Sequence, residues 1–204
     1  MSSRTIRTDA VGRREARPEL ATVVVTASGD GESAVDARAT ARDRALAIRE
    51  SVTAVSEECL RTVTCRVEAA SEFFEPDTDA PYLAEEKLHV DCTPERAEDV
   101  VVAVTEAGGT VQDVRFELHD AVRRELEDEA LAAAMERARE KAERVAAAEG
   151  LAVSAVREVT TGNGDEGMQP IAEEALAGIP ATDFRPDPIA VTATVEAVYE
   201  LVER

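Results

Sequence analysis

The sequence predicts an α+β protein in which antiparallel sheets are packed with alanine-rich helices. Some segments alternate apolar and polar residues as strands do, and others repeat alanine at steps of three and four as helices do. The clearest strand pattern is 189–202, and the longest helix pattern is 120–150. Taken in order, the segments predict the arrangement β-β-α-β-β-α-β-α-β-β. With 204 residues, the chain is long enough to bury a core without disulfides.

The amino-terminal segments predict two strands and a helix. Residues 4–16 form a highly charged strand, which is typical of a sheet edge. Residues 20–27 form a β-branched strand, and 28–31 are expected to turn into the helix. The apolar stripe of that helix consists of Ala34, Ala37, Ala41, Ala45, Ile48, Val52 and Val55.

The next segments predict an antiparallel hairpin formed by residues 60–74 and 82–92, joined by the acidic link EPDTDAP. The expected inward positions are Val63, Cys65, Val67 and Ala69 on the first strand, and Leu88, Val90 and Cys92 on the second. The expected outward positions on the second strand are Lys87, His89 and Asp91. Thr93 and Pro94 then predict the start of a helix with Ala97, Val101 and Val104 inward, which ends at Gly108 and Gly109.

The carboxyl-terminal half predicts a strand at 111–118, a long helix, and strands at 151–160 and 189–202. Asp120 is expected to cap the helix and Gly150 to end it in a left-handed conformation. Its stripe consists of Leu131, Ala134, Met135, Ala138, Ala142, Val145 and Ala146. Because alanine has little surface to bury, we expect this stripe to act mainly by letting the helix backbone lie close to a sheet.

The segment 161–188 is the one irregular region, with glycines, prolines, acids and at most a short helix at 171–176. A connection of this length predicts a binding loop, an oligomerisation arm or a mobile segment. Its apolar residues could pack on their own subunit, dock on a neighbouring subunit or contact a ligand. They are Met168, Ile171, Leu176, Ile179 and Phe184. The chain is predicted to be a single domain over 1–204, with lobes at 1–92 and 93–204 as the alternative.

The charge argues against several classes of partner. Forty-three acidic and 23 basic residues give a net charge of -20, which disfavours nucleic acid and anionic membranes. The only lysines are Lys87 and Lys141, aromatic residues make up 3% of the chain, and the composition resembles that of halophilic proteins from salt-accumulating microbes. Residues 1–20 lack the pattern of a secretion signal, and no run reaches transmembrane length. We therefore expect a cytoplasmic protein without membrane insertion.

The sequence predicts no catalytic residue, cofactor or metal site. His89 and His119 have no neighbouring His or Cys at metal-ligand spacing, and no nucleophile or phosphate-binding motif is present. The three cysteines Cys59, Cys65 and Cys92 are expected to be reduced thiols. Cys65 and Cys92 could pair on oxidation if their strands are neighbours, and this alternative stays open.

Nearly the whole chain resembles the SIMPL-domain family, as a haloarchaeal-type member. The resemblance is carried by TVTCRVEAASEFFEP, PYLAEEKLHVDC, EAGG before VQDVRFELHD, ALAAAMERAREKAERVAAAEGLAVSAVREV and the final PIAVTATVEAVYEL. It implies an α+β subunit with helices packed on antiparallel sheet. Relatives include periplasmic immunogenic proteins that form ring-like oligomers, and others linked to oxidative stress or signalling. The resemblance implies no reaction, and this sequence departs from many relatives in lacking a secretion signal.

These observations favour a non-enzymatic, self-associating cytoplasmic protein, with a stress-related or envelope-related role, that works as a homo-oligomer. The alternative is a small-molecule or peptide binding module that uses the 161–188 loop. A hydrolase-like enzyme is the third hypothesis.

The charge predicts that the folded state depends on salt. At about 1 M salt the screening length is only ~3 Å, so the repulsion among the acidic residues is largely removed. We expect the melting temperature to fall when the protein is moved from multimolar KCl to dilute buffer. An unchanged melting temperature would contradict this explanation of the acidic composition.

Overall fold

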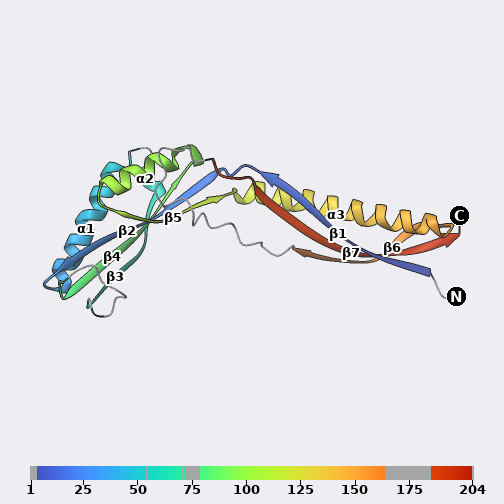
Figure 1. Ribbon diagram of the computed structural model, residues 1–204, viewed down its shortest axis with the longest axis horizontal. Helices are drawn as coiled ribbons and strands as arrows, with labels where there is room; N and C mark the ends of the chain where they lie inside the picture. Colours follow the sequence, from blue (N-terminus) through green and yellow to red (C-terminus); the bar gives the residue numbers. More distant parts are fainter. Residues whose placement is uncertain (1–3, 54, 70, 72–78, 164–184, 204) are drawn as a thin grey trace. The chain divides into compact units, whose positions relative to one another are not determined.

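The computed structural model describes residues 4–53, 55–69, 71, 79–163 and 185–203 (Figure 1). Its main helices and strands follow the order β-β-α-β-β-α-β-α-β-β, and both sheets are antiparallel. The predicted α+β class and element order are therefore confirmed. The chain divides into two compact units, and each is described by itself.

The four-strand unit comprises β2 (Leu20–Gly31), α1 (Ala34–Ser51), β3 (Leu60–Ala69), β4 (Tyr82–Cys92), α2 (Ala97–Glu106) and β5 (Thr110–Glu117). Its sheet has the order β3-β4-β2-β5. Both helices pack on the same face of this sheet (Figure 1). The core between them is made by alternate strand residues and one stripe from each helix, including Val23, Val25, Leu88, Val90, Ala45, Ile48, Val100 and Val104.

The three-strand unit comprises β1 (Arg4–Ala16), α3 (Asp120–Ala148), β6 (Leu151–Asn163) and β7 (Ile189–Glu203). Its sheet has the order β1-β7-β6, and α3 runs along one face (Figure 1). The core consists of Ala134, Ala138 and Ala142 of α3 against Val195, Ala197 and Tyr199 of β7. The two units differ from the halves 1–92 and 93–204, because β1 belongs with α3 whereas α2 and β5 belong with the earlier strands.

In both units a strand glycine allows the helix to lie unusually close to the sheet. A Cβ atom on Gly12 of β1 would overlap the carbonyl oxygen of Ala130 and lie 2.8 Å from the Ala134 nitrogen. A Cβ atom on Gly29 of β2 would overlap the Ala41 nitrogen and lie 2.8 Å from the Ala37 oxygen. These atoms belong to helix backbone, which cannot rotate away, so only glycine fits. The predicted turn at 28–31 is therefore wrong: these residues continue β2 beneath α1.

The two units share one path of the chain. In each, a strand, an alanine-rich helix and a hairpin follow in sequence order, and the second hairpin strand pairs with the first strand. The equivalent elements are β2, α1, β3 and β4 in one unit and β1, α3, β6 and β7 in the other. The four-strand unit adds α2 and β5, and its sequence lies between β1 and α3. The chain thus contains a structural repeat.

Several predicted details of the helix ends are corrected. Pro94–Arg96 form a 3-10 turn before α2, and Thr93 makes no side-chain cap bond. On α2, Ala97, Val100 and Val104 are buried, whereas Val101 is only half-buried. Asp120 is the first residue of α3, and His119 occupies the cap position. The predicted left-handed glycines are confirmed after α2 and α3, with φ of +81° at Gly108 and +71° at Gly150.

The predicted inward face of β3 is only partly right. A register shift between Thr62 and Thr64 turns Thr62 toward the helix side, where it pairs with Leu88, and leaves Val63 48% exposed. Cys65 is exposed although it pairs with Glu86 on that side, because β3 is the edge strand. On α3, Val145 is exposed rather than inward, since the row that meets the sheet is Ala130, Ala134, Ala138, Ala142 and Ala146.

The close packing of α3 predicts that size at Ala138 is critical. Ala138 is fully buried, and its carbonyl oxygen accepts a 2.9 Å hydrogen bond from Thr8 Oγ1. Ala138→Leu should lower the free energy of unfolding by about 1 to 3 kcal/mol through overpacking. Urea denaturation in molar KCl would measure it.

Two controls separate packing from helix propensity. Ala132 is exposed on the same helix, and alanine and leucine are both good helix formers, so Ala132→Leu should be nearly silent. Glu140→Gln on the solvent side should be nearly silent as well. Equal stability of Ala138→Leu and Ala132→Leu would show that α3 is not closely packed.

Candidate functional sites

The five loop residues proposed as contacts lie outside the described residues. They are Met168, Ile171, Leu176, Ile179 and Phe184, and the described chain stops at Asn163 and resumes at Arg185. Their role in oligomer or ligand contacts stays a prediction. The surfaces considered below are built from described residues alone.

The cysteines of the hairpin cannot form the disulfide that the sequence left open. Cys65 pairs with Glu86, and Cys92 lies six residues further along β4. At about 3.3 Å per residue this places the two cysteines roughly 20 Å apart along the strands, far beyond disulfide reach. Burial, followed by the charges of Asp91 and Cys59, raises the pKa of the Cys92 thiol to about 11. Cys92 is therefore a neutral thiol of the core at neutral pH.

A buried carboxylate ties α1 to the edge of the four-strand sheet. Glu86 is 7% exposed, and its Oε2 lies 3.0 Å from Arg38 Nη1 in an ion pair that lacks hydrogen-bond geometry. Its Oε1 accepts a 3.0 Å hydrogen bond from Thr62 Oγ1, which itself accepts one of 2.8 Å from Arg49 Nη2. A buried charge needs such partners, so removing Arg38 would leave Glu86 without its ion-pair partner. The network has a structural role.

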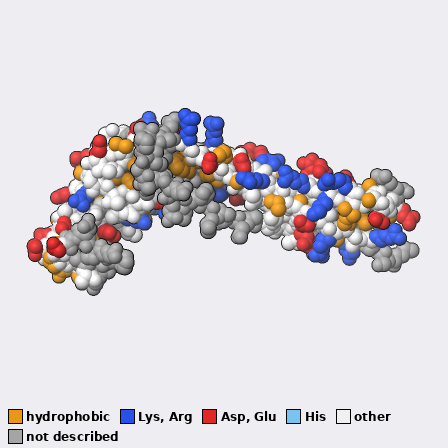
Figure 2. Space-filling model, in the orientation of Figure 1, with side chains coloured by type: hydrophobic (Ala, Val, Ile, Leu, Met, Phe, Trp, Pro, Cys, Tyr) orange, Lys and Arg blue, Asp and Glu red, His pale blue; other side chains and the backbone are white. Residues whose placement is uncertain are grey.

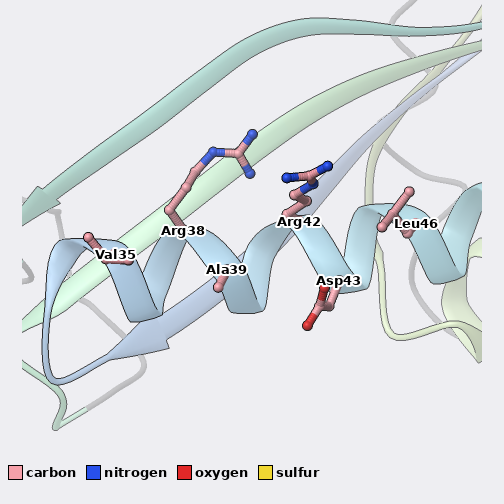
Figure 3. Close-up of a pocket in the computed structure, with 6 residues that line it drawn as sticks. All are labelled: Val35, Arg38, Ala39, Arg42, Asp43 and Leu46. Atoms are coloured by element: carbon pink, nitrogen blue, oxygen red, sulfur yellow. The ribbon is translucent and has the colours of Figure 1, made fainter.

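A shallow groove of about 510 Å³ runs along the outer side of α1 (Figure 3). Arg38 and Arg42 extend from the same side of the helix, and Asp43 extends from the opposite side (Figure 3). Val35 is 77% exposed here. The described lining residues are Val35, Arg38, Ala39, Arg42, Asp43 and Leu46. All come from one helix, so this surface offers charge and apolar area without groups from several elements that converge on one point.

An apolar strip lies on β6, which we call the β6 strip and define as Val153, Val156 and Val159. Val156 pairs with Tyr199 and Val159 with Ala197, both of which are buried beneath α3. The strip therefore lies on the helix side of the sheet. Val156 and Val159 nevertheless remain 44% and 40% exposed, and Val153 is only half-buried.

The exposure of the β6 strip follows from the position of α3. Polar side chains tie α3 to β1: Arg137 Nη1 donates to the Val11 carbonyl oxygen at 2.8 Å, and Lys141 Nζ lies 3.2 Å from Asp9 Oδ1. A third contact joins Arg14 Nε to Glu129 Oε2 at 3.2 Å. The helix thus covers β1 and the central strand β7, and these side chains also protect β1 as a sheet edge. The opposite edge, β6, is left with Val156 and Val159 partly exposed.

The face of the four-strand sheet away from α1 and α2 gathers charged side chains around His89. We call it the helix-free face. Lys87, His89 and Asp91 point to this side, as predicted, and the register places Arg61 opposite His89. Asp91 accepts hydrogen bonds of 2.9 Å from Thr22 Oγ1 and 2.6 Å from Arg61 Nη2. Asp113 Oδ2 lies 2.8 Å from Arg115 Nε.

Burial and the neighbouring cations both favour the neutral form of the His89 imidazole. Its pKa is lowered, first by desolvation and then by the charges of Arg115, Arg61 and Lys87, against which only Asp91 acts. Among the described residues there is no group of three or more His, Cys, Asp or Glu that could hold a metal ion. The other histidine, His119, belongs to the three-strand unit.

The fold defines the class of the protein: an α+β chain in which alanine-rich helices cover one face of each of two antiparallel sheets. The chain belongs to the SIMPL family, whose model matches residues 6–199 and is described as "Protein of unknown function (DUF541)". Comparison with curated proteins gave no match. None of the helices in the described parts of the chain is long and apolar enough to cross a membrane.

Proposed function

We propose that this SIMPL-family protein is a non-enzymatic, self-associating protein, and that the β6 strip lies at the centre of the contact between copies. The observation that carries the proposal is the exposure of Val156 and Val159 on the side of the sheet where their paired neighbours are buried. A second copy packed on this strip would bury the valine side chains that α3 does not cover. The resemblance to relatives that form ring-like oligomers also supports self-association.

The β6 strip is too small to form a stable interface alone, so the contact must also include polar residues around it. Burying a valine completely stabilises by roughly 1.5 to 3 kcal/mol, and these valines are already more than half-buried. Stable interfaces bury about 1,200 to 2,000 Å² in total. The outer surface of α3 offers such a surround, since both signs of charge are interspersed over the visible face of the three-strand unit (Figure 2). We therefore place the strip at the centre of the contact and the charged surface at its rim.

The non-enzymatic part of the proposal rests on how the chemically capable side chains are used. Glu86, Arg38 and Arg49 hold α1 on its sheet, and Thr62 links them. Cys92 is a core thiol with a raised pKa. Each of these groups stabilises the fold through contacts already described. We propose a cytoplasmic location, a haloarchaeal-type origin and a stress-related or envelope-related role on composition and resemblance alone.

The two alternative functions remain predictions. A small-molecule or peptide binding module would use the 161–188 loop, whose apolar residues lie outside the described residues. A hydrolase-like enzyme would need a nucleophile and base that converge, and no particular described residue favours it. We therefore give self-association precedence.

Light scattering after gel filtration in molar KCl tests the proposal. At tens of micromolar, the wild-type protein should have the mass of an assembly. Val156→Glu combined with Val159→Glu should shift the mass toward that of the monomer, because burying unpaired carboxylates at the contact is strongly unfavourable.

The matched control is Val35→Glu on α1. It introduces the same side chain at a valine that is 77% exposed and lies outside the strip, so the assembly should persist. A strictly monomeric wild-type protein would contradict self-association. An assembly that survives the double substitution would remove the β6 strip as its contact.

A further inference from the structure

Three cations from three different strands surround one neutral imidazole on the helix-free face. Arg61 of β3 lies directly opposite His89 of β4, and Lys87 lies two residues before His89, on the same face. Arg115 of β5 pairs with Thr22 of β2, which in turn pairs with Asp91 of β4. Alternation and register therefore bring the imidazole and the three cations to the same side of the sheet.

Asp91 and Asp113 orient the two arginines without using all their donors, and alternation places two further carboxylates, Glu85 of β4 and Glu117 of β5, on the same face. Asp91 accepts from Arg61 Nη2 and Asp113 from Arg115 Nε, so one nitrogen of each guanidinium is engaged. A guanidinium has five N–H donors, which leaves each arginine further donors. Lys87 makes no ion pair with a described residue.

We propose that the helix-free face binds a small tetrahedral oxyanion, such as sulfate or a phosphoryl group, between His89, Lys87, Arg61 and Arg115. A tetrahedral anion presents several oxygens in different directions, which suits donors that arrive from three strands. A planar carboxylate presents two oxygens and would leave part of this set unused. This site is independent of the β6 strip and of self-association.

Binding should be linked to the protonation of His89. Free His89 is mainly neutral at pH 7, because desolvation, Arg115, Arg61 and Lys87 hold its pKa below the ordinary value. A bound dianion favours the imidazolium, so it raises the pKa of His89. By reciprocity, affinity increases as the pH falls from 7 toward the pKa of the free protein. The acidic groups on the same face are Asp91 and Glu85 of β4 and Asp113 and Glu117 of β5.

Nuclear magnetic resonance of the histidine rings tests the site, because His89 and His119 are the only two histidines. The probe is potassium sulfate exchanged for potassium chloride at constant ionic strength; sulfate keeps its charge over this pH range. The His89 signals, assigned by their loss in His89→Gln, should shift saturably, and the pKa of His89 should rise. His119 should respond little and serves as the internal reference.

Variants and related anions make the test specific. Lys87→Gln should weaken sulfate binding roughly two- to fivefold, as expected for loss of one partly exposed charge, and Lys141→Gln in the other unit should leave it unchanged. Tighter binding of O-phosphoserine than of sulfate would identify a phosphoryl group on a larger molecule as the ligand. Tighter binding of sulfate would identify a free anion.

Three results would overturn the proposal. Equal, unsaturable shifts of both histidines would show only a general salt effect. Acetate binding as tightly as sulfate would contradict a tetrahedral site. Unchanged sulfate affinity in Lys87→Gln would show that the cations around His89 do not hold the ligand.

Discussion

The close contact between helix backbone and strand glycine is the constraint on which the structure depends. Gly12 lets α3 rest on β1, and Gly29 lets α1 rest on β2, at positions where a methyl group would overlap helix backbone. The alanine rows follow from this, because larger side chains would push the helices away. The hydrogen bond from Thr8 to the Ala138 carbonyl and the reach of Arg137 to β1 require the same short separation. Aromatic residues are only 3% of the chain, so the cores depend on closeness of packing.

The repeated path of the chain explains where surface is left for function. In each unit one alanine-rich helix is narrower than the sheet it covers, and the outer hairpin strand is left at the edge. The edge strand β3 is tied to α1 through Arg49, Thr62 and Glu86. The edge strand β6 instead leaves Val156 and Val159 partly exposed, which is why we propose it as the contact between copies. The addition of α2 and β5 widens the four-strand sheet, and β5 brings Arg115 to the helix-free face of that sheet.

Much of the fold follows from local sequence patterns, whereas the surfaces depend on register. The bounds of β1 and the start of β7 agree with the sequence, and so does the row of alanines in α3, because alternation and helical spacing are local. The extension of β2 through Gly31 was missed because glycine signals a turn unless a helix lies above it. Composition and spacing could not place Arg61 and Arg115 beside His89, since each comes from another strand. The β6 strip was missed because alternation does not show how far a helix extends over a sheet. Register shifts near Val156 also interrupt the pattern.

The most direct test of this account compares alanine substitutions at three strand glycines. A Cβ atom at Gly12 or Gly29 would meet helix backbone, whereas one at Gly162 would lie 2.9 Å from Thr194 Oγ1, a side-chain atom whose displacement costs only its 3.0 Å hydrogen bond to the Gly162 carbonyl oxygen. Substituting alanine also restricts the unfolded chain, which favours the folded state slightly. In denaturant titrations in molar KCl, Gly12→Ala and Gly29→Ala should each lower the free energy of unfolding by about 1 to 3 kcal/mol or more. Gly162→Ala should lower it by less, at most about the 0.5 to 1.5 kcal/mol of one hydrogen bond. If all three variants were equally stable, close packing of helix on glycine would not be what holds α3 and α1 on their own sheets.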